Sequence, residues 1–427
     1  MKSKHFPLLI SVMIMLVTFA SLAAASNWAQ FQKDEKHTGV TTDYGPDDAT
    51  ISINWSIPVG NGMIDTVPVM LGDYIYVEGM TDLSKYNKYS GVLEDTLTVA
   101  ESGGFPFQNA CPASDGDNII YVVDTAYGGS KQPKITAVYG NNMTAKWTTS
   151  FAPATHQCSC PVTYYNDGGV GKLFVGTVNM STTDPVNLSD DGTYYALYAE
   201  NGTEIWNRPT TTNKGYYWAG AAVVGNFIVY PDDAGTLTSV YICNGTRANE
   251  TDLSSQEIRS SATYNTDDHL IYVAGKDKYV RSVEINPATG VFGASQSYHM
   301  DEGSTSTPAY NAVDHRIYVA SGAYNAGHVY CLNATSFEDD EDEIWVVSLG
   351  HKIQSSPAVA YNSTNNPLIF VTGNDADGNV YRIEDCGSSC DVESVSPPNN
   401  TYSLPGVAVS GDYAYFGNDN GYLYQVK

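Results

Sequence analysis

The stretch that decides the fold of this chain is SSPAVAYNSTNNPLIFVTGNDADGNVYRI, residues 355–383. It holds apolar segments rich in the β-branched and aromatic residues that favour strands. The segment 373–379 between two of them consists of Gly, Asn, Asp and Ala, and the first three tolerate the positive φ angles of a hairpin turn. No sustained 3.6-residue apolar period occurs here or elsewhere, so we predict antiparallel strands joined by short turns.

The same phrase recurs along the chain, with a small or polar residue, an apolar strand, a turn and then Ile-Tyr-Val or a close variant. The second-strand cores are Ile75–Val77, Ile120–Val122, Leu173–Val175, Ile228–Tyr230, Ile271–Val273, Ile317–Val319, Ile369–Val371 and Ala414–Phe416. Their spacing averages about 48 residues, which is the length of one propeller blade. We therefore predict an all-β fold, an eight-bladed β-propeller of four-stranded antiparallel blades, as a single domain over residues 26–427.

Tryptophans mark the expected outer strands of the blades. Trp206 follows a glycine-containing turn, and Trp147 and Trp345 stand in comparable places. Trp55 precedes the first repeat, whereas the eighth repeat reaches Lys427 without an outer strand of its own. We predict that the N-terminal segment pairs in the last blade and closes the ring, because an open sheet edge invites aggregation.

The N-terminus predicts export. Lys2 and Lys4 precede an apolar run over residues 6–20, and Ala23–Ala25 supplies small residues for cleavage, so residues 1–25 are expected to be a signal peptide. The run is too short for a mature transmembrane helix, and no later stretch approaches the roughly 20 apolar residues needed to span a bilayer. We expect a secreted protein at the cell surface that is not membrane-embedded, with retention of the leader as an anchor left as the alternative.

The charge balance excludes some partners. Lys and Arg number 21 against 47 Asp and Glu, for a net charge of −26, and such a surface repels nucleic acid and anionic lipid. Asn-X-Ser/Thr sequons predict a glycoprotein, although a chain rich in these residues produces some by chance. The sequons are at Asn54, Asn142, Asn179, Asn187, Asn201, Asn244, Asn249, Asn333, Asn362 and Asn399.

Three segments resemble the pyrroloquinoline-quinone-type repeat propellers. Residues 28–34 (WAQFQKD) with 37–39 (HTG) look like the opening of exported members, residues 355–371 like the inner two strands of a blade, and residues 195–206 like the outer two. The family includes quinoprotein alcohol dehydrogenases and the lipoprotein scaffold of the bacterial outer-membrane assembly machine. The acidic, sequon-rich composition is also similar to that of archaeal surface proteins. The resemblance implies the propeller fold over the whole mature chain, but the same blades carry enzymes and plain scaffolds.

The quinoprotein members imply a calcium-binding acid set, a catalytic Asp and adjacent, mutually bonded cysteines. This sequence has no Cys-Cys dipeptide and no acids that match those roles, so a pyrroloquinoline quinone cofactor is not expected.

The default ligand site of such a propeller is the mouth of its axial channel, formed by the loops that enter the innermost strands and by the hairpins between second and third strands. Tyr216, Tyr217 and Trp218 immediately precede an inner strand, where aromatic rings could stack on sugar rings or planar cofactors. The favoured interpretation is that these three residues cap the propeller core, with the ligand role as the alternative.

Cysteines offer a second set of candidates. Cys111 and Cys160 occupy matching positions in adjacent repeats, with Cys158 and His156 just upstream of Cys160. One disulfide from Cys111 to Cys158 or Cys160 is the favoured interpretation, and a metal site with His156 is the alternative.

Two further groups lie close together in the seventh repeat. Cys386 and Cys390 bracket a short turn and are expected to form a local disulfide. Asp375, Asp377 and Asn379 form the best candidate calcium site, with ordinary turn chemistry as the alternative.

These observations favour an exported, non-enzymatic propeller that recognises a cell-surface protein or polysaccharide. The alternative is an enzyme that uses the channel face, either a quinoprotein-like oxidoreductase or an extracellular hydrolase. No Gly-x-Ser-x-Gly, His-Glu-x-x-His or P-loop motif supports the enzyme.

Overall fold

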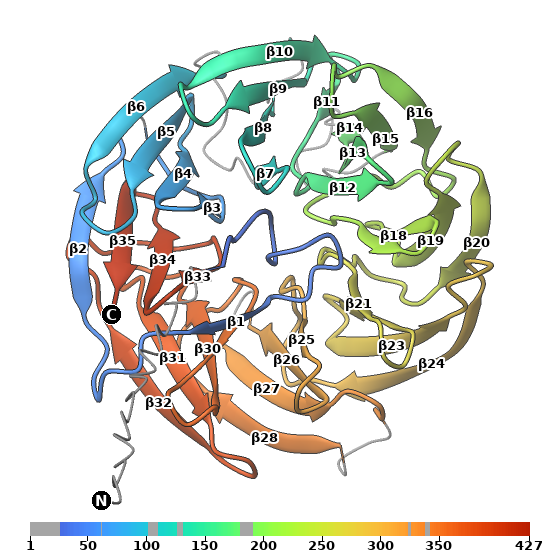
Figure 1. The fold of residues 1–427 in the computed structure, drawn as a ribbon. Coiled ribbons are helices and arrows are strands. Elements are labelled where there is room, and N and C mark those ends of the chain that lie inside the picture. Colours follow the sequence, from blue (N-terminus) through green and yellow to red (C-terminus); the bar gives the residue numbers. More distant parts are fainter. Residues whose placement is uncertain are drawn as a thin grey trace, which may run out of the picture.

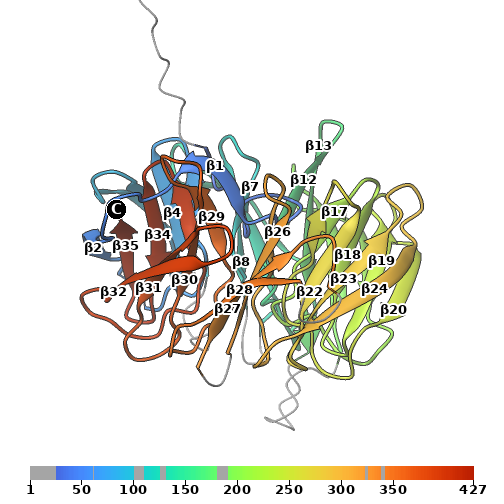
Figure 2. The same cartoon turned by 90° about the horizontal axis from the view of Figure 1, so that it is seen from below.

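Eight β-sheets surround a central axis in the computed structural model (Figure 1). It describes residues 26–60, 62–100, 110–125, 131–179, 191–322, 326–337 and 342–427, so the predicted signal peptide and the sequon at Asn187 lie outside the described residues. Seen from the side, the sheets form a short cylinder (Figure 2). We number the blades in chain order from the first complete repeat.

Blades one to four each contain four strands that run in sequence order from the axis outward. They are β3 (Val69–Leu71), β4 (Tyr74–Glu78), β5 (Asp82–Asn87) and β6 (Leu93–Thr98); β7 (Ala113–Ser114), β8 (Ile119–Asp124), β9 (Lys134–Tyr139) and β10 (Thr144–Ser150); β12 (Thr163–Asp167), β13 (Val170–Gly176), β15 (Thr193–Tyr198) and β16 (Glu204–Pro209); β17 (Ala222–Val224), β18 (Phe227–Pro231), β19 (Thr236–Tyr241) and β20 (Arg247–Asp252). A separate two-stranded ladder joins β11 (His156–Gln157) to β14 (Val178–Asn179).

Blades five to eight repeat this order, but the last two also receive N-terminal strands. They are β21 (Thr263–Asn265), β22 (Leu270–Ala274), β23 (Tyr279–Ile285) and β24 (Phe292–His299); β25 (Ala309–Asn311), β26 (Arg316–Ser321), β27 (His328–Asn333) and β28 (Glu343–Ser348); β29 (Ala358–Tyr361), β30 (Pro367–Thr372), β31 (Val380–Asp385) and β32 (Cys390–Val395), with β1 (Val40–Tyr44) parallel to β29; β33 (Ala408–Ser410), β34 (Tyr413–Gly417), β35 (Tyr422–Val426) and β2 (Ile53–Pro58).

The predicted all-β, eight-bladed fold is confirmed. Each apolar core identified in the sequence falls in the second strand of its blade, as Ile369–Val371 does in β30, and these strands are buried. A strand with sheet on both sides of it and blades packed on both faces has no solvated face, which explains why the cores are continuously apolar rather than alternating. The described part of the chain contains no helix with the length and apolar character needed to cross a membrane.

The last blade contains strands from both ends of the described chain. Strand β2 pairs antiparallel with β35, with Ile53 opposite Val426 and Pro58 opposite Tyr422. Figure 1 shows β2 at the rim of the ring, outside β35. The sheet order is therefore β33, β34, β35 and β2 from the axis outward.

The predicted outer-strand tryptophans dock four of the blades against the next one. Trp147 of blade two donates its indole N–H to the Ala199 carbonyl of blade three (3.2 Å), and Trp206 of blade three donates to Ile242 of blade four (2.9 Å). A Cβ added to Gly202 would lie 2.6 Å from the Trp147 ring, so the absence of a side chain there makes room for the indole. These contacts pack neighbouring blades against one another near the rim of the ring.

Candidate functional site

The N-terminal segment 26–44 closes one end of the axial channel. It crosses the centre of the ring (Figure 1) and lies toward one end of the cylinder (Figure 2). The segment bonds to the innermost strand of every blade in turn, through Trp28 O and N with Met70, Ala29 O with Ser114 N, Gln30 with Tyr164, Glu35 O with Val223 N, Lys36 O with Tyr264 N, Thr38 O with Tyr310 N, Gly39 O with Val359 N, and Ser26 O with Ser410 Oγ.

Polar side chains buried in this segment have hydrogen-bond partners. Gln30 pairs with the backbone of Tyr164 through both amide atoms, and Gln32 Nε2 donates to the Pro357 carbonyl (3.0 Å). The imidazole of His37 lies 3.1 Å from the Ala262 carbonyl through Nδ1. Burial lowers the pKa of His37 to about 4, so the ring is neutral at physiological pH. The indole N–H of Trp28 is an exception and has no partner among the described residues.

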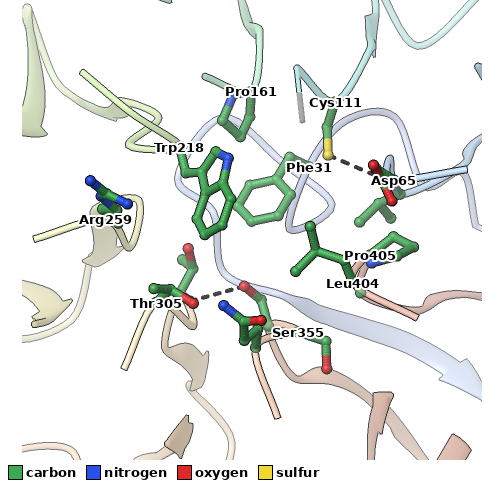
Figure 3. Close-up of a pocket in the computed structure, with 15 residues that line it drawn as sticks. Phe31, Asp65, Cys111, Pro161, Trp218, Arg259, Thr305, Ser355, Leu404 and Pro405 are labelled. Atoms are coloured by element: carbon green, nitrogen blue, oxygen red, sulfur yellow. Dashed lines mark hydrogen bonds between the residues drawn. The ribbon is translucent and has the colours of Figure 1, made fainter. Parts of the chain in front are cut away.

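The other end of the channel holds a small pocket of about 60 Å³, with Phe31 of the N-terminal segment in its lining (Figure 3). That is room for a few water molecules, and it is far below the roughly 300–1,000 Å³ of pockets for drug-sized ligands. Each blade contributes through the residues that precede its innermost strand, namely Asp65, Cys111, Pro161, Trp218, Arg259, Thr305, Ser355 and Leu404 from blades one to eight.

Repeat symmetry explains which residues reach the pocket. Asp65 lies four residues before the first residue of β3, and Trp218 and Arg259 stand at the same distance before β17 and β21. Equivalent backbone positions of successive blades converge on the axis, so one position of the repeat supplies much of the wall.

Polar atoms of the pocket wall lack partners. Asp65 is only 5 % exposed, yet neither carboxylate oxygen accepts a hydrogen bond from an N–H or hydroxyl group of the described residues. The indole N–H of Trp218 and the hydroxyl of Thr305 are likewise buried and unpaired. The Asp65 carboxyl instead shares a hydrogen bond with the Asp419 carboxyl. Native proteins pair nearly all buried polar groups, so an acid held only by another acid, next to an unpaired indole N–H and an unpaired hydroxyl, indicates a place where a ligand supplies the partners.

The surroundings of Asp65 oppose its ionisation. Burial is the main cause, and the neighbouring Asp419 carboxyl adds a like charge, so the pKa of Asp65 is raised well above its usual range. Glu78 is a second buried acid whose pKa is raised by burial and by Asp124, but it does not line the pocket.

The backbone of Trp218 is also unusual. Its φ angle is +70°, in the left-handed region that costs a bulky residue on the order of 1–3 kcal/mol. Strain of this kind persists where the surrounding structure enforces it, and it is concentrated at functional sites. Here it holds the indole beside Phe31 at the pocket (Figure 3).

The one arginine of the pocket wall is already engaged. Arg259 Nε and Nη2 donate to the buried Asp233 carboxylate at 3.2 and 2.9 Å, and Glu257 lies 3.7 Å away. The guanidinium also stacks on Tyr217, 4.6 Å from the ring centroid. Arg259 stands across the pocket from Asp65 (Figure 3), so it does not neutralise that carboxylate.

The three aromatic candidates from the sequence separate into different roles. Trp218 lines the pocket as the channel-mouth interpretation predicts, while the ring of Tyr217 stacks on the Arg259 guanidinium. Tyr216 is buried away from the pocket, where its ring meets Tyr194 and Tyr230 edge to face at centroid distances of 5.1 and 5.3 Å. For Tyr216 the core-capping interpretation therefore describes its place.

His156 lies in β11, outside the pocket lining. Its Nδ1 is 2.9 Å from the Thr177 hydroxyl, and its Nε2 is 3.8 Å from Asp191. Burial lowers the pKa of His156 despite the nearby carboxylate. These contacts give the imidazole a structural role in tying the β11–β14 ladder to blade three.

All seven cysteines are unbonded in this structure, so both predicted disulfides stay predictions. Cys111 lines the pocket, and burial raises the pKa of its thiol to about 12. Cys158 and Cys160 are fully buried, and Cys160 Sγ donates to the Tyr216 carbonyl. Among the described residues, Cys111, Cys158 and His156 do not come close enough together to hold a metal ion.

The predicted calcium residues are only partly brought together. Asp375 and Asp377 converge with His351, with candidate ligand atoms within 4.8 Å of one another, whereas Asn379 is engaged elsewhere by Ser396 and Tyr381. An imidazole among the ligands favours zinc or a related ion over calcium. The ion pair of His351 with Asp375 accounts for the arrangement without any metal.

The sequons differ in accessibility. Asn54, Asn142, Asn201, Asn244 and Asn399 are exposed, and Asn179, Asn249 and Asn333 are half-buried. Asn362 is buried, and its Nδ2 atom, to which a glycan would be attached, donates to Glu384 (2.8 Å). In the folded protein, the Asn side chains of the other eight described sequons are therefore more accessible for glycan attachment than Asn362.

No family model matches the sequence, and neither does any curated protein. Solved structures with a similar fold include BamB from Moraxella catarrhalis, at 13% identity and a TM-score of 0.60, over 88% of this chain and 100% of that one. Quinohemoprotein alcohol dehydrogenase from Comamonas testosteroni aligns at 9% identity and a TM-score of 0.69, over 95% of this chain and 81% of that one. The computationally designed Ika8 protein aligns at 12% identity and a TM-score of 0.63, over 87% and 98%. Identities this low establish a common fold alone.

Sequence reasoning missed Asp65, Arg259 and Thr305. The signal was present, because each stands four residues before an inner strand, as Trp218 does. Finding them requires aligning the repeats on the start of the inner strand, whereas the alignment on the residue before Pro or Ala selected cysteines instead. The raised pKa of Asp65 depends on burial and on Asp419, 354 residues later in the chain, so no local pattern reveals it.

Proposed function

We propose that this protein is an exported, non-enzymatic binding protein of the cell surface that recognises its partner through the pocket end of the axial channel. One observation carries the proposal, namely the buried polar groups around a single pocket on the axis, where Asp65 is paired only with another acid and the Trp218 indole N–H and Thr305 hydroxyl have no partner among the described residues. A ring closed by docked blades and a plugged channel holds these groups in place, so binding costs little ordering entropy.

An extracellular hydrolase is the second candidate, and the Asp65 and Asp419 carboxyls favour it. Paired acids with raised pKa values are a common acid–base device. Two observations favour binding instead. Asp419 is not among the residues that line the pocket, and the Cys111 thiol, one of the nucleophilic groups in the lining, is buried with its pKa raised to about 12 rather than lowered. The small pocket volume also argues against a resident quinone.

The test compares binding of the purified protein to isolated cell envelopes of its source with the binding of two variants. Trp218→Ala removes an aromatic wall of the pocket, and Tyr402→Ala removes an exposed aromatic side chain that does not line the pocket. We expect saturable binding that Trp218→Ala weakens at least about tenfold and that Tyr402→Ala leaves unchanged. Equal binding by all three proteins would contradict the proposal, as would turnover of chromogenic ester or glycoside substrates that is lost in Asp65→Asn.

A further inference from the structure

The pocket is built to receive a positive charge. Asp65 brings to its wall a carboxyl group whose side-chain partner is another acid, Asp419, and the ionised form of Asp65 carries a large desolvation cost because no basic group faces it away from water. A cationic group placed against Asp65 would remove that cost.

The protein does not supply this cation itself. Arg259 is the pocket's one basic residue, and it is bound by Asp233 and Glu257 on the opposite side (Figure 3). Asp419, the titratable group beside Asp65, is another acid. The incoming partner must therefore bring the positive charge, and the net charge of −26 steers cationic partners toward the protein.

The donor set is wrong for a metal ion. Among the described residues, the one place where at least three metal-ligating groups gather is His351, Asp375 and Asp377, in another part of the molecule. At the pocket, a divalent cation would find one carboxylate where calcium takes six to eight oxygen ligands.

The apolar walls fit an alkyl stem that carries an ammonium group. Phe31, Trp218 and Leu404 line the space beside Asp65 (Figure 3), and aromatic faces attract cations directly. A volume of about 60 Å³ admits only a few heavy atoms, comparable to the end of a lysine side chain. The unpaired indole N–H of Trp218 offers a donor to a carbonyl, which a peptide backbone has and a simple amine lacks.

We propose that this pocket binds the ammonium end of a lysine side chain of a partner protein, with Asp65 as its counter-ion and Phe31 and Trp218 as its aromatic walls. The inference rests on the proposed binding function and names the chemistry of the partner. The lysine enters from the pocket end of the channel, because the N-terminal segment crosses the other end.

The experiment titrates the folded protein with two peptide mimics that differ only in the charged end. N-acetyl-lysine methylamide carries the ammonium, and N-acetyl-norleucine methylamide keeps the stem without it. We expect the lysine mimic to bind at least about tenfold more tightly, by calorimetry and by tryptophan fluorescence. Asp65→Asn should abolish this preference, whereas Asp117→Asn, which removes an exposed acid in the β7–β8 turn, should preserve it.

Several results would overturn the proposal. These are equal binding of the two mimics, an unchanged preference in Asp65→Asn, and binding of a methyl glycoside or of calcium in place of the lysine mimic. Failure of both mimics to bind also overturns it. If envelope binding then still depends on Trp218 but not on Asp65, the lysine inference alone fails. If envelope binding is independent of Trp218, the proposed function fails with it.

Discussion

The two ends of the axial channel differ in how their buried polar side chains are hydrogen-bonded. At the end closed by the N-terminal segment, Gln30, Gln32 and His37 each have a backbone partner in a different blade or blades. At the pocket end, Asp65 and Thr305 are also buried, but the Asp65 carboxyl is paired only with the Asp419 carboxyl and the Thr305 hydroxyl has no partner among the described residues. Both ends are built from loops and short strands at the same axis, so the difference does not come from the fold.

The contrast separates groups that hold the ring together from groups that are available to a ligand. A paired buried group stabilises the folded state, and removing it leaves its partner unsatisfied. An unpaired buried group destabilises the folded state until a ligand satisfies it. Substitutions at the two ends should therefore change stability in opposite directions.

The largest effect is expected for His37→Ala. The change removes a fully buried ring, leaves the Ala262 carbonyl without its imidazole partner, removes one of the two contacts of the Thr163 hydroxyl, and opens a cavity next to Phe31. We expect a loss of about 3 kcal/mol in the free energy of unfolding, measured by denaturant titration. A loss below about 1 kcal/mol would mean that the contacts of the N-terminal segment contribute little to the free energy of unfolding.

The same residue predicts how stability depends on pH. Because the pKa of His37 is about 4 in the folded state and about 6.5 when unfolded, the unfolded state binds more protons between these values. Stability contributed by neutral His37 is thus present above pH 6.5 and is lost as pH falls toward 4, by up to roughly 3 kcal/mol. His37→Gln should remove this part of the pH dependence, and parallel curves for the two proteins would contradict the assignment.

At the pocket end, Asp65→Asn should stabilise the protein at neutral pH by about 1–2 kcal/mol. The folded-state pKa of Asp65 is raised, so stability falls as pH rises from the unfolded pKa near 4 through the folded value. Asn cannot ionise and escapes that loss, so the stability advantage of Asp65→Asn should vanish near pH 4. Thermal unfolding at pH 7 and near pH 4 measures this advantage, with Asp117→Asn as the control. A variant that is destabilised at neutral pH would show that the Asp65 carboxylate has a structural partner that Asn cannot replace.

The architecture could be read from the sequence because it repeats. The second-strand cores recur in every blade and the outer-strand tryptophans in four of the eight, so each copy supports the others. Both predictions are confirmed, by β4 through β34 and by the contacts of Trp147 and Trp206. Residues 26–44 cross the channel only once, so no repeated sequence pattern predicts this crossing.

The candidate site was predicted only in its location and in Trp218. A single sequence places Trp218 before an inner strand, but it cannot show that its φ angle is positive or that its indole N–H has no partner. It equally cannot show that Arg259 is bound by Asp233 while Asp65 is paired only with another acid. These are statements about packing between blades that are far apart in the sequence.

The smallest and cleanest comparison is one substitution made at both ends, Thr163→Val and Thr305→Val. The hydroxyl of Thr163 donates to the Ala221 carbonyl (2.9 Å) and lies 3.3 Å from His37 Nε2, whereas the hydroxyl of Thr305 has no partner among the described residues. Both side chains are buried, and valine has nearly the same shape as threonine, so packing changes little at either end. We expect Thr163→Val to cost about 1–2 kcal/mol, because it leaves a carbonyl and an imidazole nitrogen unpaired. Thr305→Val should be neutral or slightly stabilising, because it removes a hydroxyl that is buried without compensation. Denaturant titration of the two variants under one condition decides the matter, and equal losses would show that the pocket end is as fully satisfied as the closed one.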